Sequence, residues 1–87
     1  MRKEDLPFDR ELFEARARIL KAMAHPGRLF IVDTLSREAR CVQDLAGMLD
    51  VDISTVSRHL SVLRNAGLVK DEKKGTKVFY SLSVPCV

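Results

Sequence analysis

The sequence has no long apolar run and few cysteines. It contains no stretch of about 18 apolar residues and begins with the charged segment MRKEDLPFDR, so it predicts neither a membrane-spanning helix nor a signal peptide. Only two cysteines are present, too few for the disulfide framework of a small secreted domain. We therefore expect a cytoplasmic protein with no membrane partner.

The common signatures of an enzyme are also missing. The chain has no glycine-rich phosphate loop and no serine, histidine and acid arrangement in a recognisable local context. Its 87 residues leave little room for a substrate pocket. Internal repeats, low-complexity segments and linkers are absent as well. We predict a single non-enzymatic domain over residues 9–87, preceded by a polar tail at residues 1–8.

The net charge of +3 is small but unevenly distributed. Residues 51–87 contain six basic and three acidic side chains, whereas the excesses of residues 1–24 and 25–50 cancel each other. This asymmetry favours an anionic partner for the C-terminal part of the chain.

The first predicted helix has a broad apolar face. Asp9 can cap a helix that runs to about Ala24. This helix carries two adjacent apolar stripes, one of Leu12, Ile19 and Met23 and one of Phe13, Ala17, Leu20 and Ala24. So wide a face either packs partly against a second copy of the chain or is buried completely in the monomer.

Two further helices are predicted before residue 51. Pro26 suits the first turn of a helix that runs to about Arg37. This helix is expected to be central and buried, because it contains Leu29, Phe30, Ile31, Val32 and Leu35. A short helix follows from about Val42 to Asp50, with Leu45, Ala46 and Leu49 turned inward. His25 is interpreted as a helix-capping or turn residue, because no second histidine or acid lies at ligand spacing.

The fourth predicted helix, within residues 53–65, has one apolar and one polar face. Its buried stripe is expected to contain Ile53, Val56, Leu60 and Leu63, whereas Ser54, Arg58, Ser61 and Asn65 point outward. The Asp52 carboxylate is predicted to accept from the backbone N–H of Thr55, and Gly67 supplies a left-handed stop after Ala66. The outward face has no acidic residue and can therefore address base edges and phosphates.

A basic hairpin follows this helix. Leu68, Val69 and Lys70 begin one strand, and Val78, Tyr80 and Leu82 alternate on the return strand. Lys73, Lys74 and Lys77 lie at or beside the tip, where they either contact DNA phosphates or form an ordinary solvated hairpin. The order of four helices and a small β-hairpin predicts a mainly α, α+β fold of the winged helix-turn-helix type.

Four ordered sequence blocks support a family resemblance. They are Ala22-Met-Ala-His-Pro-Gly-Arg-Leu29, Cys41-Val-Gln-Asp-Leu-Ala46, Ser54-Thr-Val-Ser-Arg-His-Leu60 and Leu63-Arg-Asn-Ala-Gly-Leu-Val69. Together they resemble the arsenic-repressor (ArsR/SmtB) family of bacterial winged-helix regulators, over roughly residues 10–84. The resemblance implies a homodimeric repressor that binds double-stranded operator DNA and leaves it when an inducer, often a metal or metalloid ion, binds.

The resemblance also implies roles for particular residues. Ser54, Thr55, Ser57, Arg58 and His59 occupy the family's recognition-helix positions, and Lys74 and Lys77 match its wing. The periodicity independently places Ser54, Arg58 and Ser61 on the outward face. His59 lies toward the apolar stripe and could equally cover the edge of the core.

The family's thiol site departs from its usual form. Its arsenite and cadmium sensors carry Cys-Val-Cys-Asp-Leu, whereas this chain has Gln43 in place of the second cysteine after Cys41. Cys86 could supply the missing thiolate from the same or the partner subunit, with Asp44 or water completing a site for a thiophilic ion such as arsenite or cadmium. Alternatively, the two thiols form a redox switch, or neither has a sensing role. No cofactor is expected to be required for folding.

Two questions remain open at the level of sequence. The family usually continues past the wing into another helix, whereas only Cys86 and Val87 follow Pro85 here. The chain is therefore either a short variant that dimerises through residues 9–24 or a truncated sequence. A winged helix that contacts a protein instead of DNA is the rival functional class, and it would show weak salt dependence.

Overall fold

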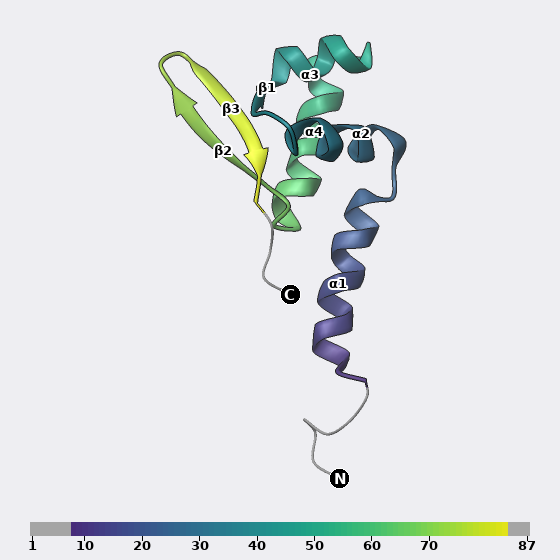
Figure 1. Cartoon of the computed structure of the whole chain (residues 1–87). Helices are drawn as coiled ribbons and strands as arrows, with labels where there is room; N and C mark the ends of the chain where they lie inside the picture. Colours follow the sequence, from purple (N-terminus) through teal and green to yellow (C-terminus); the bar gives the residue numbers. More distant parts are fainter. Residues whose placement is uncertain (1–7, 84–87) are drawn as a thin grey trace.

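The computed structural model describes residues 8–83, which form four helices and three strands (Figure 1). In chain order these are α1 (Arg10–Met23), α2 (Pro26–Leu35), β1 (Arg40–Cys41), α3 (Val42–Leu49), α4 (Ile53–Asn65), β2 (Val69–Lys74) and β3 (Lys77–Leu82). Between residues 8 and 83, no helix has the length and apolar character needed to cross a membrane. The predicted order of four helices and a hairpin is confirmed, with one additional strand.

Most of the expected helix boundaries are present. The Asp9 carboxylate caps α1 by accepting from the backbone N–H of Leu12 at 3.2 Å. Pro26 lies in the first turn of α2, and Gly67 adopts the left-handed conformation after α4, with φ of 80°. Helix α2 ends at Leu35, two residues before the expected end. Asp50 ends α3 in the left-handed region, which aspartate tolerates better than most side chains.

The predicted side-chain cap of α4 is wrong. The Asp52 carboxylate accepts from the hydroxyl of Ser54 at 3.3 Å, and no side-chain cap bond reaches the helix backbone. The N–H of Thr55 bonds to the main-chain carbonyl of Asp52 at 3.1 Å. The Ser54 hydroxyl, and not a backbone N–H, donates to the Asp52 carboxylate, so the type of an N-cap residue does not decide which bond it makes.

The sheet contains one strand more than the sequence predicted. Strand β3 lies between β1 and β2, and both of its neighbours are antiparallel to it. In β1, Arg40 pairs with Tyr80 and Cys41 pairs with Phe79. Two residues are too short to show the alternation that marks a strand, so sequence periodicity could not find β1. This strand connects the start of α3 to the wing.

The core lies between α2, α3 and α4. Its fully buried side chains are Ile31 from α2, Leu45 from α3, and Val56, Leu60 and Leu63 from α4. Helix α1 contributes Ala22, with Ile19 and Met23 packed against the cluster. The apolar stripe of α4 that contains Val56, Leu60 and Leu63 is therefore confirmed.

Three residues expected in the core are exposed instead. Leu29 and Phe30 of α2 are 50% and 37% exposed, so α2 is buried on only one side. Ile53 is 50% exposed because it is the first residue of α4 and extends beyond the packed part of the helix. Periodicity assigns a residue to a helix face but does not reveal where along the axis the neighbouring elements end.

Candidate nucleic-acid interface

The outward face of α4 is polar and accessible. Ser54, Ser57, Arg58 and Ser61 are exposed, and Thr55 is half-buried. In a helix-turn-helix, the N-terminal residues of the second helix contact base edges while the preceding helix crosses the backbone. Helix α4 therefore presents hydroxyls and a guanidinium where such contacts are made.

The position of His59 does not fit its expected role in DNA contact. His59 is buried on the core side of α4, and its Nδ1 accepts from Arg28 Nε at 3.2 Å. Its ring centroid lies 4.5 Å from that of His25. Burial lowers the pKa of His59 below its ordinary value of 6.5, and the nearby charges of His25, Arg28 and Arg58 act in the same direction. The ring contributes to packing, as the alternative interpretation allowed.

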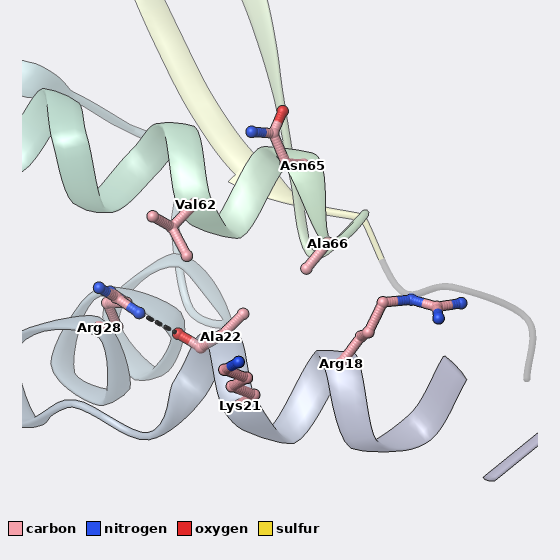
Figure 2. A pocket seen from close by; sticks show the side chains of 7 residues that line it. All are labelled: Arg18, Lys21, Ala22, Arg28, Val62, Asn65 and Ala66. Carbon is pink, nitrogen blue, oxygen red and sulfur yellow. Dashed lines mark hydrogen bonds between the residues drawn. The ribbon is translucent and has the colours of Figure 1, made fainter. Parts of the chain in front are cut away.

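His25 and Arg28, at the start of α2, contact the side of α4 that faces the core. The Nδ1 of His25 accepts from the backbone N–H of Gly27 at 3.0 Å, which confirms that His25 caps α2. Arg28 Nη1 donates to the carbonyl of Ala22 at 3.2 Å, so one guanidinium joins α1, α2 and α4. Figure 2 shows this bond at the edge of a hollow of about 340 Å³, which Arg18, Lys21 and the C-terminal residues of α4 also line.

The wing carries its positive charge at the tip. Lys73, Lys74 and Lys77 are all exposed, and Lys74 lies directly opposite Lys77 in the β2–β3 pair. Gly75 and Thr76 form the turn, with Gly75 at φ of 66°. Like charges at paired positions destabilise a hairpin, and a polyanion would remove that penalty.

A groove separates the wing from the start of α4. It has a volume of about 350 Å³, and its lining includes Gln43, Ile53, Ser57, Thr76, Lys77 and Val78. Lys73 pairs with Val78, so its side chain leaves the wing on the same face as Val78. Sequence reasoning missed Gln43, Ile53 and Thr76 because the groove forms only when α3, α4 and the hairpin come together.

The candidate sensing cysteine lies at a structural junction. Cys41 is buried, belongs to β1 and immediately precedes α3. Asp44 is exposed in the first turn of α3, and Cys86 lies outside the described residues. Within residues 8–83, no three or more histidine, cysteine, aspartate or glutamate side chains are grouped to hold a metal ion. The described residues therefore do not fit a complete metal site.

One apolar stripe of α1 is largely exposed, and the ring of Phe8 stacks on Phe13 at its N-terminal end, with centroids 5.5 Å apart. Phe13 is 43% exposed and Leu20 is 67% exposed, and Ala17 and Ala24 of the same stripe are also exposed. The other stripe, of Leu12, Ile19 and Met23, is half-buried. The single chain thus covers one stripe partly and leaves most of the other exposed.

The polar helix α4, the helix α3 before it and the basic hairpin after it define a winged helix-turn-helix domain. The sequence profile of the family described as "Bacterial regulatory protein, arsR family" matches residues 25–71. The chain therefore belongs to this family of bacterial regulatory proteins, which agrees with the expectation of a regulatory protein and not an enzyme.

Individual relatives agree with this assignment. The HTH-type transcriptional repressor SmtB of Mycobacterium tuberculosis is 40% identical over 77 residues, which cover 88% of this chain and 57% of SmtB. HlyU from Vibrio cholerae matches with a TM-score of 0.83 and 36% identity over 87% of this chain and 83% of HlyU. The chain thus spans little more than half the length of the curated relative.

A third match describes an assembly. It is a fragment of Mb0332 from Mycobacterium bovis, described as a homodimeric winged helix-turn-helix DNA-binding domain and a possible ArsR-family regulator. The TM-score is 0.78 with 32% identity, over 90% of this chain and 74% of the fragment.

Proposed function

We propose that the chain is the DNA-binding part of a homodimeric transcriptional repressor acting in the cytoplasm, where bacterial operators are found. One observation carries the proposal. The exposed hydroxyls and Arg58 of α4 are combined with a wing whose tip holds Lys73, Lys74 and Lys77. The helix supplies groups that read bases, and the lysines supply contacts to phosphates.

The second copy is proposed to pack on the exposed stripe of α1. Phe13 and Leu20 offer apolar side chains that are costly to leave in water. The similar Mb0332 fragment is described as homodimeric, which supports a dimer but does not identify its interface. A two-fold dimer would place its two α4 helices in successive major grooves, about 34 Å apart along the duplex.

Binding to promoter DNA tests this proposal. Fluorescence anisotropy with the DNA upstream of the protein's own gene should show tight, sequence-specific binding. If the six wing lysines of a dimer contact phosphates, affinity should fall on the order of 10³-fold between about 50 and 200 mM salt. Specific binding with little salt dependence would contradict the wing contacts. No DNA binding at any salt concentration would favour the protein-contact module instead.

We further propose that the inducing signal acts at Cys41. The backbone of Cys41 pairs with Phe79 of the wing, and the residue also precedes α3, so a change there reaches both parts of the interface. A thiophilic ion such as arsenite or cadmium would need a donor beyond the described residues, such as Cys86 or a group of the second copy. Oxidation of the thiols is the alternative signal.

The Cys41→Ser variant separates these possibilities. It should retain operator binding and lose release by arsenite or cadmium in reductant, or by peroxide after reductant removal. Comparison of the two treatments on the unaltered protein identifies the class of signal. Normal release of Cys41→Ser by the same agent would overturn the assignment to Cys41.

A further inference from the structure

The DNA-facing surface contains one large apolar side chain that its neighbours do not explain. Ile53 is half-exposed at the first position of α4, where the rest of the exposed face consists of hydroxyl, amide and guanidinium groups. Ile53 and Ser57 are four residues apart, so they lie on one side of the helix, and both line the groove beside the wing. Val78 of the wing lines the same groove and is 36% exposed.

The charges around this groove favour a polyanion as the occupant. Lys77 lines it, and Lys73 lies on the same face of the wing as Val78. Asp71 also lies on that face, and its carboxylate is in an ion pair with Arg64 at 3.4 Å. No acidic side chain is among the residues that line the groove. A groove that combines apolar side chains with neighbouring lysines is suited to a duplex, which presents base edges between two lines of phosphates.

Only one apolar group is available on base edges in the major groove. This group is the C5-methyl of thymine, because cytosine has only a hydrogen at C5 and the nitrogen and oxygen atoms of the edges are hydrogen-bond donors or acceptors. Ile53 has no donor or acceptor on its side chain, but it can remove that methyl group from water. Ser57, one turn later, can hydrogen-bond to an adjacent base.

We propose that Ile53, supported by Val78 across the groove, reads the 5-methyl group of a thymine in each operator half-site. This inference rests on the proposed function and specifies one position of the sequence that the repressor recognises. Ile53 is a specificity-determining residue because its contact distinguishes thymine from cytosine, adenine and guanine by an apolar group.

Replacing thymine with uracil tests the contact directly, since this removes only the methyl group. Each thymine of the operator is replaced in turn, in both half-sites together, and affinity is measured by anisotropy. One symmetric pair should weaken binding about fourfold per half-site, as expected for burial of one methyl group. The penalty should disappear in Ile53→Ala and largely remain in Ile53→Val.

The controls separate this contact from other effects. Val51→Ala shortens another exposed apolar residue that precedes α4 and does not line the groove, so it should keep the uracil penalty. Circular dichroism should show that Ile53→Ala is folded, because the Ile53 side chain lies outside the core. At the sensitive position, 5-methylcytosine should bind more tightly than cytosine to the unaltered protein.

Two results would overturn the inference while leaving the proposed function intact. One is specific operator binding that no uracil substitution weakens. The other is a uracil penalty that persists undiminished in Ile53→Ala. Failure of the unaltered protein to bind any promoter or selected DNA specifically would overturn both the inference and the proposed function.

Discussion

The exposed face of α4 with its wing and the exposed stripe of α1 differ in chemistry, although one chain leaves both largely exposed. The first surface presents Ser57, Arg58 and lysines, groups that water solvates well. The second presents Phe13 and Leu20, which gain free energy when a partner covers them. Figure 1 shows α1 and the wing extending in different directions from the helical centre.

The comparison indicates how the two surfaces depend on each other. Each copy has a single α4, and a dimer presents two of them to one duplex, which multiplies the affinity of the individual helices. On the proposed arrangement, the apolar surface controls how strongly the polar surface binds DNA, because it forms the dimer. Variants that affect only one surface should distinguish dimer formation from DNA contact.

The largest effect is expected for Leu20→Lys in α1. A charge on this 67% exposed residue leaves the monomer core unchanged but opposes apolar packing between two copies. The protein should become monomeric in analytical ultracentrifugation, with an operator affinity reduced on the order of 100-fold. Glu14→Lys is the control, because it also places lysine on α1 but on the polar side, where it replaces an exposed ion pair with Arg10. A dimeric Leu20→Lys would contradict the proposed interface.

A large but smaller loss is expected for Arg58→Ala in α4. Removing a guanidinium that contacts base or phosphate should cost about 1–3 kcal/mol of binding free energy, or about five- to 150-fold in affinity. Arg64→Ala is the control from the same helix, because Arg64 pairs with Asp71 of the wing at 3.4 Å. Both variants should remain dimeric. Equal DNA affinities for the two variants would show that Arg58 does not contact the DNA.

The wing lysines should have modest individual effects that depend on salt. Lys74→Ala removes one charge from each protomer, so affinity should fall several-fold at moderate salt. The slope of log affinity against log salt should decrease by about two for a dimer. Lys70→Ala is the control, since Lys70 pairs with Ser81 at the base of the hairpin. An unchanged slope for Lys74→Ala would show that Lys74 does not contact a DNA phosphate.

The smallest effect concerns stability and pH at His59. Its pKa is lowered in the folded protein, so the unfolded chain binds more protons between the folded pKa and the ordinary value of 6.5. The stabilising contribution is fully present above pH 6.5 and is lost as pH falls toward the folded pKa. Urea unfolding should show less destabilisation on acidification for His59→Gln, which retains an acceptor for Arg28. Identical pH profiles would show that His59 does not titrate with unfolding.

Sequence periodicity was most informative where one helix face controls burial. Val56, Leu60 and Leu63 form the predicted stripe, and Ser54, Arg58 and Ser61 are exposed as expected. The same reasoning failed for Ile53, because the first turn of α4 extends past its packing partners. It could not decide the position of His59, which lies at the edge of the stripe. Burial of this ring depends on Arg28, which donates to its Nδ1.

The sequence by itself determined the order of the elements, the polar face of α4, the basic wing and the family resemblance, because each depends on residues close together in the chain. Only the tertiary structure decided that β1 joins the wing, that Arg28 connects three helices and that Ile53 faces a groove with Val78. These features join residues between 6 and 40 positions apart. Their contacts depend on how the helices pack against one another, and the local spacing of residues does not specify that packing.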